Sequence, residues 1–315
     1  MDDLVFSLNA TMPVFLLMVF GMILRRLRVI DDVFASCMNA FVFHVALPVL
    51  LFGDISSIDF GTGWDGRFVA ACFAITLASI AIVWMLSFAI RKKGLRGEFI
   101  QSAYRSSAAL LGVALMQNMY GSSEMAALMI VGAVPLYNIV AVVALTAMKP
   151  EGKQDDARTL VKRSLRGIVA NPIIAGIAAG FVFALSGLPM PPIAQSLIGS
   201  IGGLATPLGL IAMGAMFDLR RAAGQIGPAA AASLIKLVGL AALFLPVAVA
   251  CGFRGEELAT IAVMLGSPTT VSCFVMARSF GHEGVLSSTA TMLTTLGSAF
   301  TLTGILFILR TLAIV

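Results

Sequence analysis

Two segments of the chain combine hydroxyl side chains with residues that weaken a helix. The first contains Ser106 and Ser107 followed by Gly112, and the second, residues 266–272, reads GSPTTVS. Proline removes a backbone donor and glycine lowers helix stability, so both segments predict helix breaks. The hydroxyls could satisfy the backbone groups that a break frees, or they could bind a ligand. For any single Ser or Thr, a plain hydrogen bond between neighbouring helices is the simpler interpretation.

Three further polar residues lie inside apolar runs. Lys236 could act as a countercharge to a carboxylate or to a helix C-terminus, or its ammonium could reach the membrane surface along an apolar stem. His44 could couple protons, or it could bind a carbonyl freed by Pro48. Asn138 could bond a neighbouring helix or contact a ligand.

Residues from the two segments and these three polar residues form the predicted binding site. Its members are Ser107, Gly112, Ala114, Pro268, Thr269, Thr270, Ser272, Lys236, His44 and Asn138. All sixteen acidic residues, Glu98 among them, can be placed in loops or at the ends of apolar runs, whereas the deep ionisable groups are Lys236 and His44. This asymmetry favours an anionic ligand over a cation, and we predict no metal site and no cofactor.

The composition indicates which elements must position the site. The chain has 315 residues, of which 59% are hydrophobic and only 12% charged, about half the charged fraction of a typical soluble domain. The net charge of +5 comes from basic clusters between apolar runs, which set membrane topology and do not indicate nucleic-acid binding. The four cysteines stand alone, without the spacing of a disulfide framework or a metal site. We expect a protein embedded in the lipid bilayer.

The apolar runs predict ten transmembrane helices, because about 20 residues are needed to cross the hydrocarbon. The predicted spans are residues 9–27, 33–53, 66–90, 102–118, 124–147, 168–186, 193–216, 228–250, 257–277 and 286–309. With both termini outside, 17 basic residues, including Arg105, lie on the inner side and three on the outer side. The positive-inside rule therefore predicts an inner-membrane protein with both termini in the periplasm.

The spacing of proline and glycine indicates an internal repeat. Pro13 and Gly21 recur as Pro172 and Gly180 with an offset of 159, and the same offset relates residues 46–48 (ALP) to 205–207 (ATP). We predict a five-helix repeat over residues 1–147, a cytoplasmic linker over 148–167 and a second repeat over 168–315. Five crossings in each half make the repeats inverted, as in many secondary transporters. The fourth and ninth spans are then the matched, broken and crossed helices.

Several short segments carry a resemblance to a known family. They are FHVALP at 43–48, LG at 111–112 leading to YG at 120–121, VPLYN at 134–138, PL at 207–208 with MG at 213–214, KL at 236–237 before Pro246, and SPT at 267–269 with Ala277. Through them nearly the whole chain resembles the auxin efflux carrier family, which includes bacterial malonate and malate carriers. The resemblance implies ten helices, a crossover of two broken helices, and a transport domain that moves against a scaffold. Many relatives have Asn at Ser107 and Pro at Ala114, so their substrates cannot be assigned to this chain.

We therefore expect a secondary carrier for a small organic anion, a mono- or dicarboxylate, that works by alternating access. Helix N-termini would attract the carboxylate, the hydroxyls would orient it and Lys236 would add charge. Two alternatives stay open: a sodium- or proton-coupled carrier of the bile-acid or antiporter type, and a membrane sensor with a transporter-like fold. A homodimer is the candidate assembly. The sequence has no nucleotide-binding motif of the GxxxxGK[ST] type and neither GxSxG nor HExxH, so we expect neither an ATP-driven pump nor an enzyme.

Overall fold

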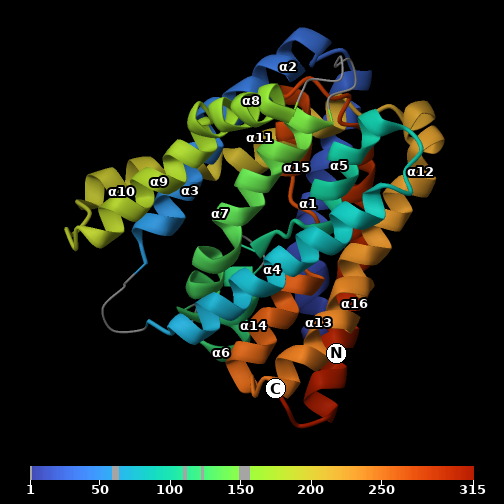
Figure 1. Cartoon of the computed structure of the whole chain (residues 1–315). Coiled ribbons are helices and arrows are strands. Elements are labelled where there is room, and N and C mark those ends of the chain that lie inside the picture. The colour runs from blue at the N-terminus through green and yellow to red at the C-terminus, as the bar shows by residue number, and fades with distance from the viewer. Residues whose placement is uncertain (1, 59–63, 109–111, 122–123, 149–156) are drawn as a thin grey trace.

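The computed structural model describes residues 2–58, 64–108, 112–121, 124–148 and 157–315. Within these ranges the secondary structure is helical throughout, with no strand (Figure 1). The prediction of an all-helical membrane protein is confirmed at this level.

Six stretches of the described chain are long and apolar enough to cross a membrane. They are Asp32–Ser56, Gly66–Ser87, Glu124–Ala147, Pro192–Ala215, Leu219–Ala250 and Val285–Thr311. These stretches overlap the second, third, fifth, seventh, eighth and tenth predicted spans. Three are single α-helices: α4 (Gly66–Ser87), α7 (Glu124–Ala147) and α16 (Val285–Thr311).

The other three stretches are interrupted within the span. The first contains α2 (Asp32–Phe41), a π-helical turn (Val42–Ala46) and α3 (Leu47–Ser56). Another contains α10 (Pro192–Gly203) and α11 (Ala205–Ala215). The last contains α12 (Leu219–Leu234), a π-helical turn (Ile235–Gly239) and α13 (Leu240–Ala250). Such interruptions free backbone carbonyls inside a helix, and polar side chains must satisfy them.

Seven further helices complete the described chain. They are α1 (Asp2–Arg26), α5 (Lys93–Tyr104), α6 (Val113–Tyr120), α8 (Ala157–Val169), α9 (Pro172–Leu185), α14 (Gly255–Gly266) and α15 (Ser272–Ser279). The first predicted span, residues 9–27, lies in α1 except for its last residue. The sixth, predicted as residues 168–186, is the short apolar helix α9, which begins after Asn171 because that side chain accepts from the amides of Ile173 and Ile174. The predicted linker, residues 148–167, contains most of α8, a helix that the sequence analysis did not anticipate.

Helix α5 begins at Lys93, nine residues before the predicted start of the fourth span at 102. Its early residues include Arg96 and Glu98, which broke the apolar pattern. Residues 97–106 are nonetheless all buried, because α5 packs against α4, α7 and α16. A helix enclosed by protein does not need an apolar sequence if its polar groups find partners.

Glycine residues allow two pairs of helices to approach closely. A Cβ atom on Gly21 of α1 would collide with the carbonyl oxygen of Ile211 in α11. A Cβ atom on Gly180 of α9 would lie 3.0 Å from the carbonyl oxygen of Phe52 in α3. Close backbone contact through small residues is the usual way in which membrane helices associate, since lipid provides no hydrophobic drive between them.

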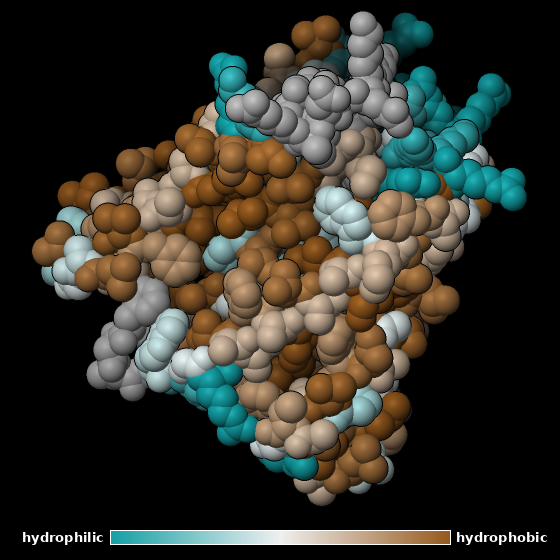
Figure 2. Space-filling model, in the orientation of Figure 1, coloured by the Kyte–Doolittle hydropathy of each residue, from teal (hydrophilic) through white to brown (hydrophobic). Residues whose placement is uncertain are grey.

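The arrangement of charge and apolar surface suits a bilayer. Both termini lie at one end of the molecule, and α2 and α8 lie at the opposite end (Figure 1). Figure 2 shows hydrophilic residues at the top and along the lower edge of this face, with hydrophobic residues covering most of the area between. Helices α3, α9 and α10 project to one side of the bundle (Figure 1).

Candidate functional site

The two segments that the sequence singled out are real breaks in helices, and they meet. Helix α5 ends at Tyr104 and residues 105–107 are not helical; α14 ends at Gly266 and α15 begins at Ser272. The amide of Ser107 donates a hydrogen bond of 2.9 Å to the carbonyl of Pro268. The break in the predicted fourth span (the first break) therefore contacts the break in the predicted ninth span (the second break) directly.

Side chains from each break satisfy the carbonyls freed by the other. The hydroxyl of Ser106 donates to the carbonyl of Met264, near the end of α14. In return, the hydroxyl of Thr269 donates to the carbonyl of Ser102, at 2.7 Å, near the end of α5. Because the terminal carbonyls of a helix have no partner within it, these contacts stabilise both breaks and lock them together.

Lys236 is fully buried in the π-helical turn between α12 and α13, and its ammonium donates to the carbonyl of Leu265. That carbonyl belongs to the last turn of α14, where the helix dipole is negative. Of the alternatives left open by the sequence, this contact matches the countercharge to a helix C-terminus.

A cavity of about 60 Å³ lies beside the crossing of the two breaks. One wall comes from Leu47, Leu50 and Leu51 of α3 and Thr206 of α11; the remaining lining residues are Arg105, Ser106, Ser107, Ala108, Val134, Tyr137, Asn138, Thr270, Val271 and Ser272. Two groups of helices thus face each other across it. The cavity combines hydroxyls, an amide and one guanidinium.

Arg105 is the residue of this cavity that sequence reasoning missed. It was counted among the inner-loop cations, but it is only 3% exposed and lies at the end of α5. Its guanidinium donates to the amide oxygen of Asn138, at 2.7 Å, and to the sulfur of Met276, at 2.9 Å. No acidic side chain among the described residues forms an ion pair with it. The signal available was its place directly before the two serines.

A buried guanidinium with no carboxylate partner among the described residues is costly, so an anion that entered the cavity would lower this cost. Asn138 holds the guanidinium in place, since its amide oxygen accepts from Arg105 while its amide nitrogen donates to the carbonyl of Val134, at 2.9 Å. Both of these amide contacts are buried. A planar carboxylate could accept two parallel hydrogen bonds from an arginine.

The predicted site residues separate into three groups. Ser107, Asn138, Thr270 and Ser272 line the cavity. Pro268 and Thr269 belong to the second break, and Lys236 caps the C-terminal end of α14. These three residues are not among the lining residues of the cavity. Gly112, His44 and Ala114 form the third group.

In the third group, Gly112 and His44 do not line the cavity, and the side chain of Ala114 is not described by the structure. Gly112 is buried, and a Cβ atom there would lie 3.0 Å from the terminal methyl of Met129. His44 is exposed, and its Nδ1 bonds the carbonyl of Ala40 at 2.9 Å. The acceptor is a backbone carbonyl one turn earlier, and it is not the carbonyl of residue 44 that Pro48 leaves without its usual donor.

Glu98 is the second buried charge that the sequence placed at a span end. It is 1% exposed, and its carboxylate accepts from the amides of Gly284 and Ser287, both at 3.0 Å, and from the Ser287 hydroxyl. These amides belong to the N-terminus of α16, where the helix dipole is positive. Glu98 and Lys236 are therefore each matched to a helix end, whereas Arg105 faces the cavity.

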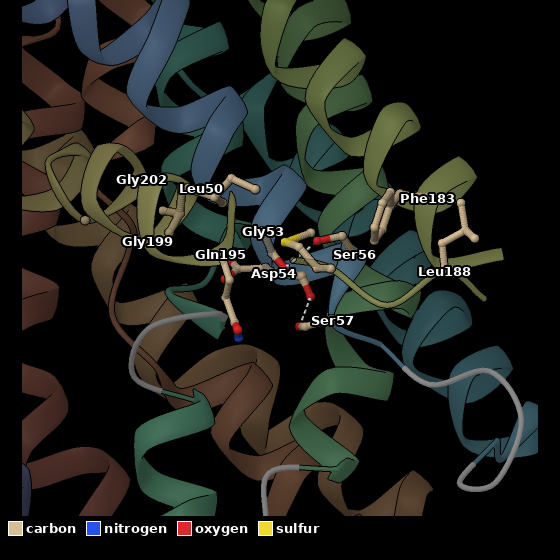
Figure 3. Close-up of a pocket in the computed structure, with 13 residues that line it drawn as sticks. Leu50, Gly53, Asp54, Ser56, Ser57, Phe183, Leu188, Gln195, Gly199 and Gly202 are labelled. Atoms are coloured by element: carbon tan, nitrogen blue, oxygen red, sulfur yellow. Dashed lines mark hydrogen bonds between the residues drawn. The ribbon is translucent and has the colours of Figure 1, made fainter. Parts of the chain in front are cut away.

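A larger cavity of about 530 Å³ lies between α3, α9 and α10 (Figure 3). Its polar lining includes Asp54, Ser56, Ser57 and Gln195, and one carboxylate oxygen of Asp54 is buried without a hydrogen-bond partner among the described residues. An unpaired carboxylate would repel an anion, so this cavity is a poorer candidate than the smaller one. No group of His, Cys, Asp and Glu in the described chain could hold a metal ion.

Comparisons with known proteins place these features in a family. The family described as "Membrane transport protein" matches residues 6–306 of this chain. A protein of Rhizobium meliloti (strain 1021) named "Putative malonate transporter" is 24% identical over 316 residues, covering 95% of this chain and 94% of that protein. An "Uncharacterized transporter" of Methanothermobacter thermautotrophicus is also 24% identical, covering 86% of this chain and 88% of that protein.

Proposed function

The chain belongs to the membrane transport protein family, which includes the auxin efflux carriers, and from that premise we propose that it is a secondary carrier for a small organic anion, working by alternating access. The observation that carries the choice of an anion is Arg105, a buried guanidinium without an acidic partner among the described residues, at the crossing of two broken helices.

Other groups around Arg105 support an anionic substrate. Helix α15 begins at Ser272, so the positive end of its dipole lies at the cavity wall. The hydroxyls of Thr270 and Ser272 line the same wall and lie 3.2 Å apart. Hydroxyls and helix N-termini can each donate to a carboxylate, and an arginine can add charge and orientation. We propose a mono- or dicarboxylate as the substrate class, and the name of the Rhizobium relative makes malonate the first compound to test.

The proposed architecture is ten spans in two inverted repeats, residues 1–147 and 168–315, joined by residues 148–167, with broken and crossed fourth and ninth spans. Contacts between helices support this symmetry. The close approach of Gly21 to Ile211 has its counterpart in the approach of Gly180 to Phe52, and the offset of 159 relates Gly21 to Gly180 and Phe52 to Ile211. The two contacts exchange when the halves are exchanged, as a two-fold relation requires.

The cavity lies where alternating access could act on it. Residues of α3 and α11 line one side, whereas residues of α7, the α5 break and the α14–α15 break line the other. Sliding of one helix group against the other would open the cavity to one side of the membrane and close it to the opposite side. The substrate could then bind Arg105 whether the cavity is open to one side of the membrane or to the other.

We also propose that the protein lies in the inner membrane with both termini in the periplasm. Arg105 no longer counts as a loop residue, which leaves 16 basic residues on the inner side and three on the outer side. The shared end of the two termini in Figure 1 is compatible with this topology. An alkaline phosphatase fused after Val315 should be active, whereas a fluorescent cytoplasmic reporter at that position would contradict the topology.

Uptake into proteoliposomes tests the function. Purified protein reconstituted into vesicles preloaded with unlabelled malonate should exchange it for labelled malonate, and other small carboxylates should compete. Malonamide, which has nearly the same shape but no charge, should not compete. The proposal fails if no carboxylate in a panel of mono- and dicarboxylates exchanges above the rate of empty vesicles, or if malonamide competes as well as the acid.

A further inference from the structure

Helix α8 (Ala157–Val169) lies between the two apolar helices α7 and α9 in the chain and packs against the end of α7. A Cβ atom on Gly167 would lie 3.2 Å from Val142 and 3.7 Å from the hydroxyl of Thr146. Both residues belong to the last two turns of α7, which ends at Ala147. Because α7 is long and apolar enough to span a membrane, α8 lies at the level where that span ends.

Three faces of α8 have different chemistry. Ser164 is buried, and Ile168 packs against the hydrophobic core, so this face contacts the protein. Val161, Leu165 and Val169 form an apolar stripe at helical spacing, with exposed fractions of 58%, 57% and 84%. A third face contains two exposed cations, Lys162 and Arg166.

The helical advance of about 100° per residue fixes the order of these faces. The apolar stripe adjoins the buried face, and Lys162 and Arg166 adjoin the stripe on the side away from α7. Among the described residues, no ion pair includes either cation. An apolar stripe and a free basic edge at the end of a span match the boundary between acyl chains and headgroups.

We propose that α8 is a binding site for anionic phospholipids in the leaflet on the side of the basic loops. Lys162 and Arg166 contact the headgroup phosphates, and Val161, Leu165 and Val169 pack among the first carbons of the acyl chains. An acidic protein would suit the cations, but at this depth it would have to displace lipid from the apolar stripe. Since α8 joins the two proposed repeats, anionic lipid holds the connection between them at the membrane surface.

Hydrogen exchange of the full-length protein in nanodiscs tests this site. Backbone amides of α8 should exchange more slowly in discs containing phosphatidylglycerol than in discs of phosphatidylcholine alone. Each basic residue near an anionic surface contributes about 1 kcal/mol, so two residues correspond to protection of up to roughly thirtyfold. The protection should decrease in about 1 M NaCl, where charge interactions are screened within about 3 Å.

A double variant provides the second arm. Lys162→Gln with Arg166→Gln should remove the difference between the two lipids, whereas Lys92→Gln with Lys93→Gln, which removes the same charge from two exposed lysines at the start of α5, should keep it. Equal exchange of wild-type α8 in both lipids would overturn the proposal, and so would a lipid difference that survives in the first double variant. The salt dependence of the wild type needs no substitution, so it decides the matter even if that variant loses the helix.

Discussion

The two helix breaks use their cations in opposite ways. At the second break, Lys236 donates to the carbonyl of Leu265, so its charge is matched to the end of α14. At the first break, Arg105 bonds two side chains, Asn138 and Met276, and lines the cavity. One cation stabilises the crossing, and the other is the one that we propose binds the substrate. Burial of a positive charge therefore does not by itself identify a substrate-binding residue; the partner atom does.

The largest effect on substrate affinity is expected from Arg105→Gln. Glutamine can keep a hydrogen bond to Asn138 but loses the charge, and charged hydrogen bonds contribute about 1.5 to 3 kcal/mol, or roughly 10- to 150-fold in affinity. The affinity of Arg105→Lys should fall between those of the wild type and Arg105→Gln, because an ammonium keeps the charge but cannot form the paired contact of a guanidinium. The measurement is the Kd of the carboxylate that wild-type proteoliposomes exchange fastest. A wild-type Kd in Arg105→Gln would assign anion binding to the hydroxyls and helix ends alone.

Lys236→Met should give the opposite result, with reduced stability and nearly normal affinity. Methionine keeps much of the volume of lysine but leaves the buried carbonyl of Leu265 without this donor, which costs about 1 to 3 kcal/mol. The midpoint of thermal unfolding in detergent should fall by several degrees. Lys92→Met, at an exposed position, is the matched control and should change neither quantity. A weaker Kd at unchanged stability would instead make Lys236 a substrate ligand.

The sequence predicted the breaks more successfully than the partners that hold them. Gly266, Pro268 and the neighbouring hydroxyls carry a local signal, because proline and glycine act on the backbone where they stand. The contact of Ser106 with Met264 joins residues 158 positions apart, and a carbonyl acceptor has no side-chain signature. Which donor reaches which carbonyl is decided by packing.

Arg105 and Glu98 show the same limit for charge. Near the end of an apolar run, a charged residue in a loop and one enclosed by protein have the same local sequence. The structure distinguishes them because α5 is buried over residues 97–106, so Glu98 can cap α16 and Arg105 can line the cavity. The predicted spans matched apolar helices whether they are exposed, like α4, or largely buried, like α7, and failed at the start of α5, where a polar sequence is enclosed by protein.

A smaller effect, on the rate of transport, is expected from Pro268→Ala. The alanine keeps the carbonyl that accepts from Ser107 but restores an N–H and permits α14 to extend. The contact between the two breaks should therefore become less ordered. Exchange should slow several-fold while the unfolding midpoint stays close to that of wild type. Pro246→Ala, inside α13 and away from the cavity lining, should leave exchange unchanged. Equal effects of both substitutions would mean that the break contributes no more to transport than an ordinary helix kink.

The smallest effect on transport is expected from substitutions of His44. They test whether the π-helical turn of the predicted second span, unlike the two breaks, has only a structural role. Its ring bonds the carbonyl of Ala40 and packs edge-on against Phe43, with ring centroids 5.0 Å apart, and it does not line the cavity. His44→Gln can retain a hydrogen bond to that carbonyl, whereas His44→Leu cannot, so Leu alone should lower stability, by about 0.5 to 1.5 kcal/mol. Exchange by both variants should follow the wild-type profile between pH 5 and 8, the range in which histidine commonly changes charge. If both variants lost a pH dependence that the wild type shows, His44 would carry a proton during transport, and the π-helical turn would be part of the mechanism as well as of the fold.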